Sequence, residues 1–176
     1  MRQTLLNQEL LAQSALGLLA DLLIKNKCLL ATAESCTGGL IAASCTELSG
    51  SSAWFDRGFV TYSNAAKTEM LGVDPQWIET HGAVSEAVAR AMVVGALARS
   101  AAQVAIAVTG VAGPTGGSAE KPVGTVWFGL AVPGQVVTEC CLFAGDRAGV
   151  RAATVQHGLQ RLYQLLSALG PTPAAG

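Results

Sequence analysis

The feature that most constrains the fold is residues 103–110, QVAIAVTG, an almost uninterrupted run of apolar and small side chains. A strand that is apolar on both faces needs cover on both sides of its sheet, as in α/β proteins. Hydrophobic residues make up 51% of the 176-residue chain and charged residues only 13%, against about 25% charged residues in an average soluble protein. The sequence therefore predicts a sheet buried between two layers of helices.

Helical and strand-like segments alternate along the rest of the chain. In the first half of the chain we expect a helix over 4–25, a strand over 28–33, a helix from Gly38 and a strand over 57–63. Three helices follow: one capped by Asn64 and ended by Gly72, a short one after Asp74, and a long one opened by Ser85. After the strand over 103–110 we expect a hairpin of strands 123–132 and 135–144 around Pro133-Gly134, and a helix from Asp146 to about Leu169. This order predicts an α/β fold, a three-layer α/β/α sandwich with a mixed β-sheet. We expect one domain over residues 1–170 and a disordered tail over 171–176.

Charge and patterning exclude several kinds of partner. The net charge is −1 and no basic cluster occurs, so no nucleic-acid partner is expected. Polar residues interrupt the apolar N-terminal segment, which also lacks a signal-peptide pattern, so we expect no membrane partner and a cytoplasmic location. The alanine-rich helix over 85–101 and the N-terminal helix could each serve as the interface of a homo-oligomer, such as a dimer.

The cysteines and histidines do not suggest a metal site. Five cysteines occur without any C-x-x-C pair, which is typical of reduced thiols in apolar surroundings. His, Cys and carboxylate residues never combine at the spacing of metal ligands along the chain. We therefore expect no metal.

Two polar, glycine-containing loops follow predicted strands, where ligands of open α/β sheets bind. The first, residues 33–39, brings hydroxyls and Gly38-Gly39 to the N-terminus of a helix, where free N–H groups favour an anion. The second, residues 109–118, contains four glycines, and its backbone N–H groups could form an anion nest. Neither loop has the P-loop or dinucleotide fingerprint. Together they favour a shared phosphate-bearing ligand.

Residues 50–67, GSSAWFDRGFVTYSNAAK, gather reactive groups in a chain with few polar residues. A serine nucleophile needs a base, and His81 and His157 both lie in contexts typical of structural residues. Of the four lysines, only Lys67 lies in an apolar amphipathic segment, beside a strand that carries Tyr62. A Ser–Lys–Tyr group is therefore the sharpest hypothesis. The Tyr-x-x-x-Lys spacing of short-chain dehydrogenases and the Ser-x-x-Lys motif are both absent.

Five blocks together resemble the CinA C-terminal family: TAESCTGGLIA, GSSAWFDRGFVTYSNAAK, HGAVSE, AVTGVAGPTGGSAEKPVGTVW and GDRAGVR. The resemblance covers roughly residues 10–165. Characterised members of that family include bacterial amidases that hydrolyse nicotinamide mononucleotide to nicotinate mononucleotide and ammonia. The resemblance thus implies a serine-dependent amidase of pyridine nucleotide recycling, without metal or cofactor. The chain looks like the stand-alone form of the family.

The resemblance also implies roles for individual residues. Ser52, or else its neighbour Ser51, would be the nucleophile, with Tyr62 and Lys67 as base and acid. A cationic neighbour such as Arg57, together with burial, would lower the pKa of Lys67. The expected substrate-binding residues are Ser35, Gly38, Gly39, Ser51, Arg57, Thr109, Gly110, Gly113 and Arg147.

Two alternatives remain open. Cys36 lies at a helix N-terminus, which lowers a thiol pKa, so it is a rival nucleophile. The same pocket could also belong to a nucleotide-binding or regulatory module linked to competence or DNA damage, without turnover.

Overall fold

The computed structural model describes residues 15–170. Within it, five strands form one mixed sheet in the order β2-β1-β3-β4-β5. Their bounds are β1 Leu30–Glu34, β2 Phe55–Val60, β3 Val104–Gly110, β4 Thr125–Val132 and β5 Gln135–Leu142. The strands β2, β1 and β3 are parallel, while β4 and β5 continue the sheet as the expected antiparallel hairpin. The carboxyl ends of β1, β2 and β3 therefore meet at one edge of the sheet.

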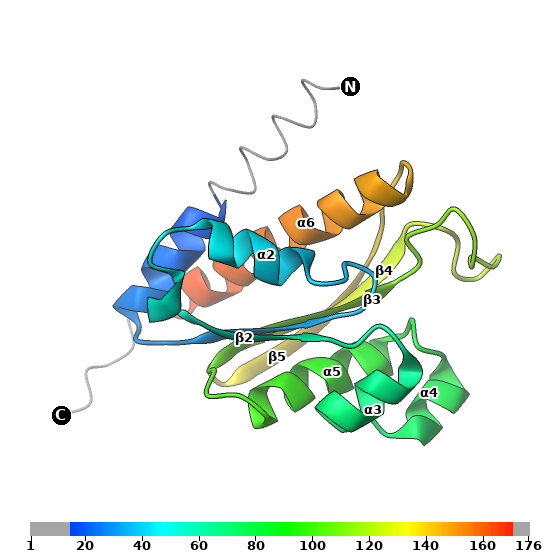
Figure 1. Ribbon diagram of the computed structural model, residues 1–176, viewed down its shortest axis with the longest axis horizontal. Helices are drawn as coiled ribbons and strands as arrows, with labels where there is room; N and C mark the ends of the chain where they lie inside the picture. Colours follow the sequence, from blue (N-terminus) through cyan, green and yellow to red (C-terminus); the bar gives the residue numbers. More distant parts are fainter. Residues whose placement is uncertain (1–14, 171–176) are drawn as a thin grey trace.

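Helices cover both faces of this sheet (Figure 1). One layer holds the helical residues 15–25, α2 (Leu40–Glu47) and α6 (Arg147–Ala168), and the other holds α3 (Asn64–Leu71), α4 (Pro75–His81) and α5 (Glu86–Ala98). The predicted three-layer α/β/α sandwich with a mixed sheet is confirmed. No helix among residues 15–170 is both long enough and apolar enough to cross a membrane.

Strand β3 shows why the run over residues 103–110 is apolar throughout. Ile106 and Val108 face the core under α6 and the helical residues 15–25. Ala105 and Ala107 face the second core, under α3 and α5. Each face of β3 thus buries its side chains against a different helical layer, and a polar residue at these positions would have no water to bond.

Side-chain caps define where the helices begin. Asp74, Ser85 and Asp146 each accept a hydrogen bond from a backbone N–H in the first turn of α4, α5 and α6, as expected. The predicted cap of α3 was one residue off. Ser63, rather than Asn64, accepts from the backbone N–H of Ala66, and its extended backbone conformation leaves Asn64 as the first helical residue.

Some boundaries differ from those expected. Strand β2 runs over Phe55–Val60 rather than 57–63, because Ser63 is needed as the cap of α3 and the chain turns away from the sheet before it. Of the helix predicted over 4–25, residues 15–25 are helical. The beginning of that helix and the tail over 171–176 lie outside the described residues.

Candidate active site

Ser35 and Lys67 meet at the carboxyl edge of the sheet. Ser35 directly follows β1, and its backbone N–H still bonds the carbonyl of Val108 on β3. Lys67 comes from α3, which follows β2. The Nζ atom of Lys67 lies 3.0 Å from Oγ of Ser35, and the pair is buried. The structure therefore pairs the predicted base with a serine that the sequence analysis had placed only in the substrate pocket.

Burial governs the protonation of Lys67. The side chain is 1% exposed, and this burial lowers the pKa of Lys67 from its usual 10.5, against a smaller opposing effect of the Cys36 thiol. The expected cationic neighbour plays no part in it. Arg57 lies exposed on β2, where it pairs with Asp56 at 2.7 Å and donates to the carbonyl of Arg99.

The Nζ atom of Lys67 has three oxygen atoms around it, which can accept from the three N–H groups of an ammonium and which also admit a neutral amine. Besides Ser35, its Nζ contacts two backbone carbonyls, of Thr61 at 3.0 Å and of Tyr62 at 3.3 Å. A neutral amine has two N–H donors and one lone pair. The two donors fit the carbonyls, and the lone pair can then accept the hydroxyl proton of Ser35. The geometry thus suits a general base aimed at a serine hydroxyl.

The buried carboxylate of Glu34 holds the loop that carries Ser35. It accepts from the hydroxyl of Thr37 at 2.6 Å and from the backbone N–H groups of Gly39, Ile41 and Ala42 at 3.1, 2.9 and 2.8 Å. These are the amide groups at the start of α2. A negative charge at a helix N-terminus is favourable, so this internal carboxylate fixes the turn between β1 and α2.

This arrangement alters the expected anion site at Gly38-Gly39. The N–H of Gly39 is taken by Glu34, and that of Gly38 bonds the carbonyl of Ser35 at 3.1 Å. Within residues 15–170, by contrast, the backbone N–H groups of Cys36 and Thr37 donate to no protein group. The donors left for a ligand therefore lie directly after Ser35 rather than at the two glycines.

Ser51 and Ser52 lie at the opposite edge of the sheet. They form a 3-10 turn, η1 (Ser51–Ala53), that leads into the amino end of β2. The carbonyl of Trp54, just after this turn, accepts from Leu30 at the start of β1. Lys67 and Ser35 lie beyond the other end of these strands, separated from the turn by roughly 13 Å or more of extended chain. The structure does not bring Ser51 or Ser52 to Lys67.

The rival nucleophile Cys36 is disfavoured by its surroundings. Its side chain is buried, and burial, with the nearby carboxylate of Glu34, raises the pKa of the thiol to about 11. A helix N-terminus is expected to lower the pKa of a thiol, but here the carboxylate of Glu34 already occupies the N–H groups at that end of α2. A thiol with this pKa holds its proton at neutral pH and is a poor nucleophile.

A groove of about 610 Å³ opens at the first turns of α6. Its lining consists of Pro114, Val123, Gly145, Asp146, Arg147, Ala148 and Arg151. Two arginines connect the groove to the Ser35–Lys67 pair. Arg151 donates to the carbonyl of Thr37 at 2.9 Å, and Arg147 lies 3.2 Å from the hydroxyl of Tyr62.

The glycine-rich loop after β3 forms one wall of the same region. Arg147 donates to the carbonyl of Gly113 at 2.9 Å, and Gly113 has a φ of 80°, where a Cβ would also collide with Val123. Thr109 is buried and donates its hydroxyl to the carbonyl of Ala83 at 2.8 Å, while a Cβ at Gly110 would lie 2.7 Å from the carbonyl of Thr125. Thr109 and Gly110 thus fix the start of the loop through contacts inside the protein.

Comparison with known proteins places the chain in a family. The model of the CinA C-terminal domain matches residues 12–166. The chain belongs to the CinA C-terminal domain family. Curated relatives include the nicotinamide-nucleotide amidohydrolase PncC of Enterobacter agglomerans, 60% identical over 73% of this chain and 79% of that protein. The protein of the same name from Escherichia coli K12 is 53% identical over 76% of this chain and 81% of its own length.

Solved structures of CinA proteins share the fold. The competence damage-inducible protein A (ComA) of Klebsiella pneumoniae matches with a TM-score of 0.85 and 41% identity, over 89% of this chain and 97% of its own. The CinA fold of this chain therefore agrees with experimental structures across nearly the whole domain.

Two residues of this CinA domain were not singled out by sequence reasoning. Glu34 was treated as part of a polar loop, and only its hydrogen bonds show that it organises the turn. Arg151 lies four residues after Arg147, so the two share one face of α6, and this spacing could have identified it. Its Nε is buried without a partner among the described residues.

Proposed function

We propose that this protein hydrolyses the carboxamide of nicotinamide mononucleotide to give nicotinate mononucleotide and ammonia, with Ser35 as the nucleophile and Lys67 as the base. The observation that carries this proposal is the 3.0 Å contact between Ser35 Oγ and the buried Lys67 Nζ. Relatives more than half identical in sequence are named nicotinamide-nucleotide amidohydrolase. The reaction belongs to the recycling of pyridine nucleotides.

In the first half of the reaction, Ser35 Oγ attacks the carboxamide carbon while its proton passes to the neutral amine of Lys67. The carbonyl oxygen becomes an oxyanion. The backbone N–H groups of Cys36 and Thr37, which donate to nothing else among the described residues, are the nearest candidates to stabilise it. The carbon–nitrogen bond then breaks, and the ammonium group of Lys67 returns its proton to the departing amide nitrogen, which leaves as ammonia.

In the second half, water hydrolyses the ester formed between Ser35 and the nicotinoyl group. Lys67 is again neutral, so it takes a proton from the attacking water. When the carbon–Oγ bond breaks, the same proton returns to Ser35. The product carboxylic acid gives its remaining proton to solvent and leaves as a carboxylate, and the enzyme regains its starting protonation state without any oxidation or reduction.

The groove at the first turns of α6 suits the nucleotide part of the substrate. Arg147 and Arg151 line it from one face of α6, and guanidinium groups bind phosphate through charged, often bidentate hydrogen bonds. The phenol of Tyr62, next to Arg147, lies where its hydroxyl can donate to the bound substrate. We assign the phosphate to the two arginines and the carboxamide to Ser35.

The test is release of ammonia from nicotinamide mononucleotide by the purified protein, with nicotinate mononucleotide identified as the product. Turnover that is lost in Ser35→Ala and kept in Ser51→Ala is the expected result. Tight binding of the mononucleotide without ammonia release over pH 6–9 would instead favour the nucleotide-binding module. Equal turnover of Ser35→Ala and wild type would contradict the assignment of the nucleophile.

A further inference from the structure

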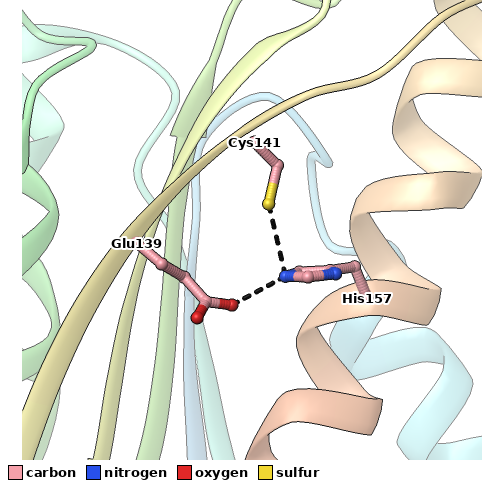
Figure 2. A group of neighbouring side chains, drawn as sticks. All are labelled: Glu139, Cys141 and His157. Carbon is pink, nitrogen blue, oxygen red and sulfur yellow. Dashed lines mark hydrogen bonds and ion pairs between the residues drawn. The ribbon is translucent and has the colours of Figure 1, made fainter.

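Three side chains with metal-binding atoms converge between β5 and α6, away from the Ser35–Lys67 pair. Glu139 and Cys141 are two residues apart on β5, so their side chains lie on the same face of the sheet. His157 reaches them from α6. The ligand atoms of the three residues all lie within 4.8 Å of one another. Figure 2 shows the side chains of Glu139, Cys141 and His157 pointing toward one another.

One imidazole nitrogen contacts both of the other side chains. The Nε2 atom of His157 lies 2.7 Å from Oε1 of Glu139 and 3.3 Å from Sγ of Cys141. If Nε2 carries a proton, it donates to the carboxylate of Glu139, and the sulfur of Cys141 is a weak acceptor beside it. If Nε2 is bare, its lone pair faces the carboxylate oxygen. A cation placed between the three atoms would accept electron pairs from all of them at once.

We propose that Glu139, Cys141 and His157 form a Zn²⁺ site with three protein ligands and a fourth position open to solvent. Nitrogen, sulfur and carboxylate oxygen are the ligand types that Zn²⁺ takes in proteins. Tetrahedral Zn²⁺ with bonds of about 2.0–2.3 Å separates its ligand atoms by roughly 3.3–3.7 Å. The sulfur–nitrogen distance of 3.3 Å already fits, and rotation of the Glu139 side chain can widen the shorter one.

Neighbouring groups already hold two of the ligands in place. Arg161 donates to both oxygens of Glu139, at 3.2 and 3.0 Å, and one of these oxygens, Oε1, also contacts His157. The rings of Phe128 and Phe143 pack against the imidazole, with centroids 4.9 and 5.8 Å away. Such outer contacts orient metal ligands.

Charge and access are compatible with a bound cation. A Cys141 thiolate and the Glu139 carboxylate supply two negative charges, which balance Zn²⁺ beside the positive Arg161. Binding releases the thiol proton to solvent, since the thiolate is the ligand. The side chains of His157 and Glu139 remain 29% and 22% exposed, so an ion can enter from solvent.

A metal at this position would tie the edge strand β5 to α6. The segment that joins them leads directly into Arg147 and Arg151, which line the groove. Spacing along the chain could not reveal this site, because the strand ligands and the helix ligand are 16 and 18 residues apart. The expectation of no metal constellation is therefore revised for these three residues.

The experiment uses the full chain, reduced and stripped of metal with a chelator. Zn²⁺ is titrated in competition with a chromophoric chelator, and Co²⁺ replaces it for absorption spectroscopy. We expect one Zn²⁺ per chain, a thiolate-to-cobalt absorption band, and a higher unfolding temperature with Zn²⁺ than with chelator. Cys141→Ser and Glu139→Gln should lose more affinity than the roughly 10–100-fold that outer-shell changes cost.

The matched control is Cys140→Ser. Cys140 is exposed. Its side chain lies on the other face of β5, the face on which Thr138 donates a hydrogen bond to Glu86 of α5. This variant should bind Zn²⁺ like wild type and keep the cobalt band. Zn²⁺ affinity unchanged by Cys141→Ser, equal loss in Cys140→Ser, or no binding by wild type would overturn the proposal. The unfolding temperature of each variant in chelator verifies that Cys141→Ser is folded.

Discussion

Two segments of the chain place serines near glycines next to a strand, and the two segments lie at opposite ends of their strands. Ser35 follows the carboxyl end of β1, whereas Ser51 and Ser52 precede the amino end of β2. Both segments lie within blocks that resemble the same family. Only the first is close to Lys67, the buried lysine whose pKa is lowered.

The difference follows from the direction of parallel strands. Because β1 and β2 run the same way, residues that follow them share one edge of the sheet and residues that precede them share the other. Lys67 follows β2, so its partner must follow a neighbouring strand. A serine that precedes β2 can form part of the turn before the strand, but it cannot reach Lys67.

The largest effect is expected from removing the nucleophile. Ser35→Ala should lower kcat for ammonia release by about 10⁴-fold or more, because no other hydroxyl among residues 15–170 is hydrogen-bonded to Lys67. Ser52→Ala, its matched control, should stay within a few-fold of wild type, since Ser52 is exposed at the other edge. A larger loss of kcat in Ser52→Ala than in Ser35→Ala would contradict Ser35 as the nucleophile.

Removing the base should have the next largest effect. Lys67→Met should lower kcat by roughly 10²–10⁴-fold, the usual contribution of general base catalysis. Lys25→Met is the control, because Lys25 is an exposed lysine at the end of the helical residues 15–25. Steady-state kinetics of the two variants measure this, and a Lys67→Met enzyme with normal kcat would exclude lysine as the base.

The groove arginines should affect binding of the phosphate more than the chemistry. Arg151→Ala should raise KM for nicotinamide mononucleotide by about 10-fold or more, the free energy of a hydrogen bond between charged groups. Nicotinamide riboside, which lacks the phosphate, serves as the comparison substrate. Its kcat/KM should change little in the same variant. Equal losses for both substrates would mean that Arg151 supports the loop through Thr37 and does not bind phosphate.

Glu34 should matter for stability as well as for rate. Glu34→Gln places an NH₂ group among N–H donors at the start of α2 and should lower the free energy of unfolding by about 1–3 kcal/mol. Denaturant unfolding measures this loss. Glu47→Gln is the control, since Glu47 ends α2 and is exposed. A Glu34→Gln protein as stable as wild type would mean that this carboxylate does not hold the loop.

The smallest effect expected is a change in the pH dependence of stability. Burial lowers the pKa of Lys67 below its ordinary 10.5 in the folded protein, so between these two values the unfolded chain binds one more proton than the folded one. Stability contributed by Lys67 therefore rises with pH across that window and levels off above 10.5. The difference in unfolding free energy between wild type and Lys67→Met, measured across this window, should rise likewise. A flat difference would contradict a lowered pKa.

Much of this could be read from the sequence, and the differences between expectation and structure have a common cause. The continuous apolar strand predicted cover on both faces of the sheet, and Asp74, Ser85 and Asp146 predicted where three helices begin, because such signals are local. Lys67 was identifiable since it is the single lysine in an apolar segment. The family resemblance pointed to Ser52, which lies in the same block as Lys67, yet the length of β2 separates the two residues in the structure. The contacts of Glu34 are tertiary, and no local pattern encodes them.

The most direct test of the account is the residue that carries the acyl group during turnover. The protein is mixed with nicotinamide mononucleotide, quenched in acid within the first turnovers, digested and analysed by mass spectrometry. The account predicts a nicotinoyl mononucleotide ester on Ser35, absent from Ser35→Ala. An ester on Ser51 or Ser52, or a thioester on Cys36, would contradict it.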